Sequence, residues 1–217
     1  MESVIFDMDG LLLDSENATF EAFQKVGEDI GCDITRDFYC SMIGVSEPYA
    51  INMLTQKFGS GFDGEGFFLK VRECVKKSYR LNGVPVKDGA KELLEFLKES
   101  GIECALGSSS AREWVEKLLK SAGLFDYFDA FVCGDEVKNA KPDPEIFIKA
   151  CKKLGVKAED AVVLEDSPFG VEAAHKAGVP VICVPDMLYP DENIIAMTCA
   201  VCGSLKEVKN YFQKIRL

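Results

Sequence analysis

The sequence contains little positive charge for its length, a single histidine and no long apolar run. Its 217 residues carry 36 acidic and 25 basic side chains, a formal net charge of −11. This balance disfavours nucleic acid and anionic membrane surfaces as partners, although a small phosphorylated molecule needs only a local positive field. No stretch approaches the length that crosses a bilayer, and the first ten residues lack the basic start and apolar core of a signal peptide. We therefore expect neither a nucleic-acid partner nor a membrane partner.

Cysteine is present, but it is not arranged in pairs. Nine cysteines are scattered along the chain, odd in number and mostly set among apolar residues, as is typical of buried, reduced thiols. We therefore expect a cytoplasmic protein. We also expect a monomer. Because 47% of the residues are apolar, the chain can bury a core, and its length suits one medium-sized domain with a modest insertion.

Short apolar runs alternate with helical patterns through the second part of the chain, which predicts βαβ units and a parallel sheet. Residues 3–8 have the character of the same strands, whereas residues 15–82 show helical patterns only. The sequence therefore predicts an α/β fold with a doubly wound, Rossmann-like parallel-sheet core of residues 1–14 and 83–217, interrupted by an inserted all-helical cap of residues 15–82. The later strands are expected at 102–106, 130–133, 161–164, 179–184 and, more weakly, 200–201.

Two acids follow the first apolar run, in the segment Asp7-Met8-Asp9-Gly10. Residues i and i+2 of a strand project to the same side, so we expect Asp7 and Asp9 to face one site at the carboxyl edge of the sheet. Two neighbouring carboxylates repel unless a cation or a shared proton lies between them, and Mg²⁺ is the natural partner. Taken alone, the motif fits a strand end with solvated acids about equally well.

The next expected strand leads into Ser108-Ser109-Ser110, which offers hydroxyls and backbone N–H groups at a helix start, where anions bind well. Ser108 is nearest the strand and is the expected phosphate ligand. Ser110 and Glu113 have the spacing of a capping box, so we interpret Ser110 as an N-cap.

Two further stations complete the pattern. Lys141 precedes a proline and could neutralise a phosphate and a nucleophile together, although taken alone it is better explained as a surface lysine. Glu165 and Asp166 follow the run Val162-Val163-Leu164 directly and form a second acidic pair at a strand end. Together with Asp7 and Asp9 they offer the oxygen ligands that an octahedral Mg²⁺ requires.

These four stations resemble the four motifs of the haloacid dehalogenase superfamily, in order and on the expected elements, and the resemblance covers essentially the whole chain. It points to the beta-phosphoglucomutase-like branch, whose small helical cap follows the first motif. The resemblance implies that Asp7 is the nucleophile and Asp9 the general acid and base. It further implies that Ser108, Ser109 and Lys141 bind the substrate phosphate, and that Mg²⁺ is held by Asp7, Asp166 and the backbone of Asp9, joined by Glu165.

The function expected from this resemblance is a Mg²⁺-dependent phosphatase that acts on a small phosphorylated metabolite, such as a sugar phosphate, through a phosphoaspartate. A phosphosugar mutase of the beta-phosphoglucomutase type and a non-catalytic Mg²⁺- or phosphate-binding module are the alternatives. Thr19 stands where the mutase resemblance places a histidine, and Glu47 where it places an arginine; losing a cation and gaining a carboxylate disfavours a second phosphate. The candidates for substrate specificity in the cap are Glu16, Glu47, Lys76 and Lys77.

Overall fold

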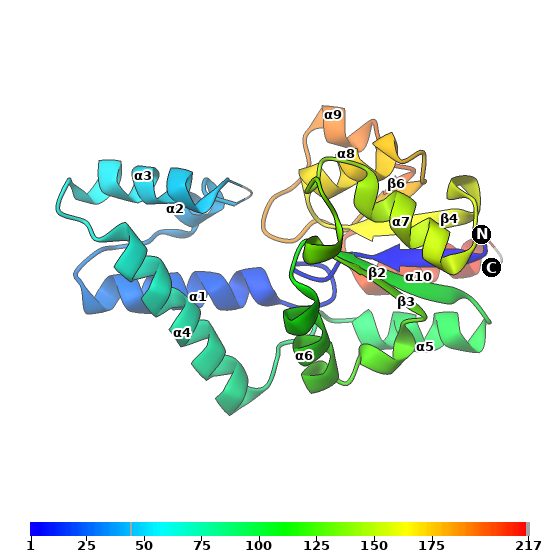
Figure 1. Ribbon diagram of the computed structural model, residues 1–217, viewed down its shortest axis with the longest axis horizontal. Helices are drawn as coiled ribbons and strands as arrows, with labels where there is room; N and C mark the ends of the chain where they lie inside the picture. Colours follow the sequence, from blue (N-terminus) through cyan, green and yellow to red (C-terminus); the bar gives the residue numbers. More distant parts are fainter. Residues whose placement is uncertain (44, 216–217) are drawn as a thin grey trace. The chain divides into compact units, whose positions relative to one another are not determined.

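The computed structural model describes residues 1–43 and 45–215, and the chain divides into two compact units (Figure 1). One unit comprises Met1–Asp14 with Val86–Leu217, and the other comprises Ser15–Pro85. The first is an α/β unit, and the regular elements among the described residues of the second are all helices. That these units act as separate core and cap domains stays a prediction.

Six parallel strands form the sheet of the α/β unit, in the order β3-β2-β1-β4-β5-β6. The chain adds β2 and β3 on one side of β1 and then returns to place β4 on the other side. The direction of winding therefore reverses between the neighbouring strands β1 and β4. In open α/β sheets, such a reversal opens a ligand-binding crevice at the carboxyl ends of the strands. The strands are β1 Ser3–Phe6, β2 Glu103–Ser108, β3 Ala130–Cys133, β4 Ala161–Glu165, β5 Val181–Cys183 and β6 Ala200–Val201.

The register of the three central strands aligns one residue of each strand in a row across the sheet. Phe6 pairs with Leu106 on one side and with Leu164 on the other. The residues that follow these three in sequence therefore lie side by side where the strands end. This row, Asp7 with Gly107 and Glu165, is the floor of the site described below.

Helices cover both faces of the sheet, as a doubly wound fold requires. Helices α7 (Glu145–Leu154) and α8 (Pro168–Lys176) pack on one face, where their apolar sides join alternate residues of the strands in one core. Helices α5 (Ala90–Glu99) and α10 (Leu205–Lys214) pack together across the sheet from them (Figure 1). The remaining elements of this unit are α6 Arg112–Ala122, α9 Glu192–Ile195, and three short turns, η1 Phe125–Tyr127, η2 Gly134–Glu136 and η3 Ala158–Asp160.

The predicted α/β fold class is confirmed, but several strand ends differ from expectation, and two of these differences affect the site. β1 ends at Phe6, so Asp7 and Asp9 lie beyond it, and strand alternation does not set their directions. Conversely, β2 continues through Ser108, which is almost completely buried at 1% exposure. Both ends are decided by pairing with neighbouring strands, which local sequence does not record.

The helical unit is built around a cluster of aromatic rings. Phe23 of α1 meets Tyr39 of α2 at 5.1 Å and Phe67 of α4 at 5.3 Å between ring centroids, both edge to face. These rings join α1 and α4 to α2, whose 5 residues are too few to form a stable helix alone. Among the described residues, no helix is both long and apolar enough to cross a membrane. The helices are α1 Ser15–Asp29, α2 Arg36–Cys40, α3 Glu47–Phe58 and α4 Gly64–Asn82.

The core of the α/β unit provides a direct test of the fold. Leu97 on α5 is fully buried, whereas Glu99 on the same helix is exposed. We expect Leu97→Ala to lower the free energy of unfolding by about 2–5 kcal/mol, because it removes buried methyl groups and leaves a cavity. Glu99→Ala should change it by less than about 0.5 kcal/mol. Urea denaturation of both variants measures the difference, and similar effects of the two substitutions would contradict the packing.

Candidate active site

The site is formed where β1 and β4 end. Asp7 follows β1, and its backbone N–H donates a 3.0 Å hydrogen bond to the carbonyl of Leu164 in β4. Glu165 is the last residue of β4, and Asp166 follows it. Carboxylate oxygens of Asp7, Glu165 and Asp166 all lie within 4.8 Å of one another, so the first and last predicted motifs do meet.

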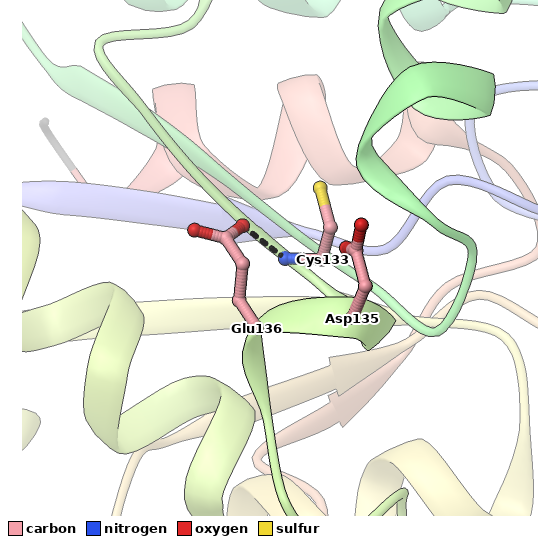
Figure 2. Close-up of side chains that lie close together, drawn as sticks. All are labelled: Cys133, Asp135 and Glu136. Carbon is pink, nitrogen blue, oxygen red and sulfur yellow. Dashed lines mark hydrogen bonds between the residues drawn. The ribbon is translucent and has the colours of Figure 1, made fainter.

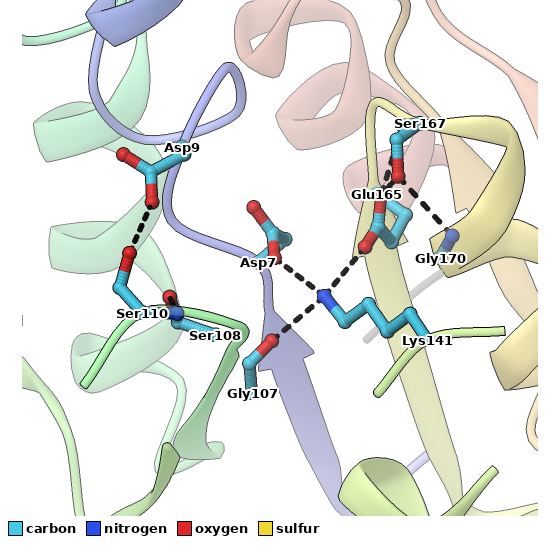
Figure 3. A network of polar contacts seen from close by, with 9 residues as sticks. All are labelled: Asp7, Asp9, Gly107, Ser108, Ser110, Lys141, Glu165, Ser167 and Gly170. Carbon is cyan, nitrogen blue, oxygen red and sulfur yellow. Dashed lines mark hydrogen bonds and ion pairs between the residues drawn. The ribbon is translucent and has the colours of Figure 1, made fainter. Parts of the chain in front are cut away.

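Lys141 enters this group of acids from the segment before α7 (Figure 3). Its Nζ donates to Asp7 Oδ1 at 2.5 Å, to Glu165 Oε1 at 2.7 Å and to the carbonyl of Gly107 at 2.9 Å. These are the three positions that the strand register brings level. The Lys141 side chain is only 6% exposed, so the alternative of a surface lysine is wrong.

Electrostatics makes this group of charges interdependent. Burial raises the pKa of Asp7 to about 7, against the opposing effect of the Lys141 charge. Burial, followed by the charge of Glu165, also raises the pKa of Asp166. For Lys141, burial alone would lower the pKa, but the charges of Asp7 and Glu165 outweigh it and raise the pKa above its usual value. The lysine is therefore held as a cation among carboxylates that resist ionising together.

Glu165 is held from two sides. While Oε1 accepts from Lys141, Oε2 accepts from the backbone N–H and the hydroxyl of Ser167, both at 2.9 Å. A Cβ on Gly170 would overlap the Glu165 carboxylate, so only glycine allows this close approach of α8. Glu165 therefore orients Lys141 directly, a role that sequence reasoning did not assign to it.

Asp9 points away from the other acids and toward the loop that follows β2 (Figure 3). Its Oδ2 accepts a 3.0 Å hydrogen bond from the hydroxyl of Ser110. The prediction that Ser110 caps the next helix is wrong: α6 begins at Arg112, its N-cap residue is Ala111, and no side chain of that residue bonds to the helix. Ser108 is the last residue of β2 and is buried, whereas Ser109, the next residue, begins the loop and is exposed.

The turn η2, which follows β3, contacts this loop and holds it in place. The main-chain N–H of Gly134 donates to the carbonyl of Ser110 at 2.9 Å, and a Cβ on Gly134 would overlap the carbonyl of Ser109. Asp135 Oδ1 accepts from the backbone N–H of Arg112, the first residue of α6, at 3.1 Å. Sequence reasoning missed this turn, because its contacts join segments that are distant in the chain.

Asp135 and Glu136 of this turn and Cys133, the last residue of β3, also lie close enough together to hold a metal ion (Figure 2). Glu136, however, already pairs with Arg112 at 2.5 Å and Lys153 at 2.9 Å. Although burial opposes it, these partners lower the pKa of Glu136 to about 2. Burial raises the pKa of the Cys133 thiol to about 11, which keeps it protonated. The cluster is therefore explained as a brace of the loop.

A second lysine, Lys87, connects the segment after β5 to the segment that follows β1. Lys87 pairs with Asp186, after β5, at 2.5 Å and with Asp14 at 3.0 Å. Asp186 Oδ2 lies 3.4 Å from the point where a Cβ on Gly10 would stand, and a Cβ there would overlap Asp166. Gly10, at a φ of 81°, thus has both carboxylates beside it. Sequence reasoning found no signal for Lys87 or Asp186.

The four cap candidates fall into two groups within the helical unit. Glu16 and Glu47 line one pocket of about 200 Å³, together with Thr19 and Tyr39. Lys77 lines a different pocket, and Lys76 is exposed beside it on α4. The structure therefore brings the two acidic candidates together and does not join the two lysines to them.

Both acids in this pocket have partners that sequence reasoning missed. Glu16 accepts from the Tyr39 hydroxyl at 2.8 Å, and Glu47 pairs with Arg72 of α4 at 2.7 Å. The predicted loss of a cation at position 47 is thus partly offset by Arg72. The sequence did contain a signal for the pairing of Glu47 with Arg72. Arg72 follows the pocket residue Phe68 by one turn of α4, so both lie on the same side of that helix.

The sheet order, the buried lysine among carboxylates and the braced serine segment define a doubly wound α/β protein with an acidic site at the carboxyl edge of its sheet. A family model described as haloacid dehalogenase-like hydrolase matches residues 4–184. The chain belongs to this family. The resemblance seen in the sequence is confirmed, together with the enzyme class it implies, a phosphatase of the haloacid dehalogenase type.

Three similar proteins illustrate the range within the family. The phosphorylated carbohydrates phosphatase of Thermotoga maritima is 40% identical over 179 residues, 82% of this chain and 82% of its own. The phosphoglycolate phosphatase of Nitrosospira multiformis is 28% identical over 99% of this chain and 96% of its own. A Thermotoga maritima crystal structure, provisionally described as a beta-phosphoglucomutase, is 35% identical, covers 99% of this chain and 100% of its own, and has a TM-score of 0.84.

The buried lysine yields a prediction about stability and its pH dependence. We expect Lys141→Met to lower the free energy of unfolding at pH 8 by about 3–5 kcal/mol, because buried carboxylates lose their counter-charge. The pKa of Asp7 is raised to about 7, so this acid takes up a proton as the pH falls below that value. Its neutral form carries no charge for Lys141 to compensate. The loss should therefore shrink between pH 8 and pH 5.

Urea denaturation in chelator at the two pH values measures this effect. Lys138→Met is the matched control, because Lys138 is exposed in the same segment. A loss that is the same at both pH values would contradict the assigned charges.

Proposed function

We propose that this chain is a Mg²⁺-dependent phosphatase that hydrolyses a small phosphorylated metabolite, such as a sugar phosphate, through a phosphoaspartate on Asp7. The observation that carries the proposal is the contact of Lys141 Nζ with Asp7 Oδ1 at 2.5 Å, within a group of three close carboxylates. A nucleophile beside a fixed cation is what attack on a phosphate dianion requires. The phosphatases among its relatives support the substrate class.

The donor set fits Mg²⁺. The close oxygens of Asp7, Glu165 and Asp166 are hard ligands of the kind this ion prefers. The pKa of both Asp7 and Asp166 is raised, chiefly by burial, and neighbouring carboxylates add to this cost, which a divalent cation would relieve. Asp7, Asp166 and the main-chain carbonyl of Asp9 would hold the ion, while Glu165 stays engaged by Lys141. When bound, it supplies charge neutralisation at the phosphoryl oxygens.

The first chemical step uses Asp7 and Asp9. A carboxylate oxygen of Asp7 attacks phosphorus, and the bond from phosphorus to the leaving alcohol oxygen breaks. Lys141 and the N–H groups of the loop at Ser108 and Ser109 stabilise the phosphoryl oxygens as charge shifts among them. Asp9 gives its proton to the leaving oxygen, so the alcohol departs neutral.

The second step returns the enzyme to its starting state. Water attacks phosphorus, and the bond from phosphorus to the Asp7 oxygen breaks. Asp9, now ionised, accepts a proton from that water. The products are inorganic phosphate and the carboxylate of Asp7, so one acid at position 9 serves both steps.

A mutase is the second candidate, because the crystal structure with a TM-score of 0.84 is described in that class. A mutase must hold a sugar bisphosphate through two transfers. Glu47 adds negative charge to the pocket of the helical unit and opposes a second phosphate, while Arg72 beside it supplies one positive charge. The two charges of this ion pair cancel, so the pair offers no excess positive charge to bind a second phosphate.

The central test is a phosphate-release assay with a panel of phosphorylated metabolites. We expect turnover that vanishes in excess chelator and returns with Mg²⁺. Asp7→Asn should abolish turnover and any covalent phosphoenzyme, because an amide is no nucleophile, whereas Asp9→Ala should slow turnover by roughly 10²–10⁴. Asp126→Asn is the matched control, because Asp126 is exposed in the same α/β unit. Full activity of Asp7→Asn, or turnover without any divalent cation, would refute the proposal; phosphate binding without turnover would indicate the non-catalytic module.

The choice between phosphatase and mutase has its own test. Supplied with beta-glucose 1-phosphate and a trace of the 1,6-bisphosphate, the protein should release inorganic phosphate and form little glucose 6-phosphate. Water should capture the phosphoaspartate first, because the pocket lacks an excess of positive charge to retain the bisphosphate. Coupled assays for glucose 6-phosphate and for phosphate on the same samples give the ratio. Efficient isomerisation with negligible phosphate release would establish the mutase instead.

A further inference from the structure

Ser110 makes three hydrogen bonds that connect separate parts of the site. Its hydroxyl donates to Asp9 Oδ2 at 3.0 Å, and its backbone N–H donates to the hydroxyl of Ser108 at 3.1 Å. Its carbonyl accepts from the N–H of Gly134 at 2.9 Å. Figure 3 shows the first two of these bonds, which join the proposed acid and base to the proposed phosphate loop through a single residue.

The hydroxyl of Ser110 is not used to begin the helix that follows. A serine before a helix normally accepts a hydrogen bond from a backbone N–H of the first turn. Here α6 begins two residues later, and the first of its N–H groups, that of Arg112, is already bonded to Asp135 Oδ1 at 3.1 Å. Because Asp135 takes over part of the capping, the hydroxyl of Ser110 is available to Asp9, 101 residues earlier in the chain.

We infer that Ser110 is a positioning residue for Asp9 in the proposed phosphatase reaction, on which this inference rests. The hydrogen bond fixes one carboxylate oxygen of Asp9 on the loop and so restricts rotation of the carboxylate about its Cβ–Cγ bond. The loop in turn is fixed by Gly134. Proton transfer depends steeply on the alignment of donor and acceptor, so a fixed carboxylate protonates a leaving oxygen more effectively than a rotating one.

This role predicts a dependence on the leaving group. A poor leaving group needs the proton of Asp9, whereas a good one departs as a stable anion. Removing the hydroxyl of Ser110 should therefore slow the first group of substrates and spare the second. A role confined to phosphate binding or to folding would affect both groups alike, because both present the same phosphate.

The experiment compares kcat/KM for phenyl phosphate and p-nitrophenyl phosphate, because this constant reports the steps up to departure of the phenol. Phenolate is much more basic than p-nitrophenolate. We expect Ser110→Ala to reduce kcat/KM for phenyl phosphate by about tenfold or more, as loss of a hydrogen bond to a charged group does, with the loss in kcat rather than KM. The value for p-nitrophenyl phosphate should stay within about threefold of wild type.

Two further variants separate the hydroxyl from the shape of the side chain. Ser110→Thr keeps the hydroxyl and should restore the wild-type ratio of the two substrates, whereas Ser110→Val, of nearly the same volume, should not. Glu113→Ala tests the competing capping-box interpretation, because Glu113 is exposed in the first turn of α6. It should leave the ratio unchanged. Unfolding curves for all four variants confirm that each is folded under assay conditions.

Each outcome decides the inference. Equal losses on both esters in Ser110→Ala, an unchanged rate on phenyl phosphate, or a Val variant that matches the Thr variant would overturn it. If the wild-type protein with Mg²⁺ cleaves neither ester and no member of the metabolite panel, the proposed function itself fails. That result is distinct from a wild-type enzyme that cleaves both esters while the Ser110 variants leave the ratio unaltered.

Discussion

The ammonium group of Lys141, held between Asp7 and Glu165, is the interaction on which the rest of the site depends. Three carboxylates cannot lie ionised in a buried crevice without a counter-charge, and a buried ammonium cannot lie there without anions. Each partner therefore makes the others possible. Breaking the set at one position leaves uncompensated charge, which explains why the surrounding chain fixes Lys141 and Glu165 so closely. The contact between nucleophile and cation that the proposed chemistry needs is, on this view, the same contact that stabilises the crevice.

The sheet produces this arrangement through register, and two glycines permit it. Pairing of β1 with β2 and β4 brings Asp7, Gly107 and Glu165 into one row, so a single lysine can touch all three. Gly170 and Gly134 then let α8 and the turn after β3 approach closer than any side chain would allow. Neither glycine carries a functional group, yet each sets the position of one that does.

Much of this could be predicted from the sequence, because the strongest signals are local. Unbroken apolar runs mark the buried parallel strands, and polar residues directly after them must gather at one edge of the sheet. The fold class was therefore accessible, as were the identities of Asp7, Lys141, Glu165 and Asp166 as a group. What the sequence could not show is which partner wins when two compete: Ser110 fits a local cap by spacing, but Asp135 from another element takes the helix N–H and leaves the hydroxyl to Asp9. The pair of Lys87 with Asp186 is hidden for the same reason, because 99 residues separate them.

The helical unit shows how a single sequence departure can mislead. Glu47 in place of an arginine suggests a simple exchange of positive for negative charge, but the structure pairs it with Arg72 at 2.7 Å, so the local charge is balanced. Both side chains are nearly half exposed, at 49% for Arg72 and 45% for Glu47, and such a pair contributes little to stability. Each partner is consequently free of any large structural cost if it turns to a ligand: the arginine toward an anionic group, the carboxylate toward hydroxyls. The pocket that Glu16 and Glu47 line thus has two carboxylates and one cation beside it, so the charge that a ligand meets depends on the Glu47–Arg72 pair rather than on either residue alone.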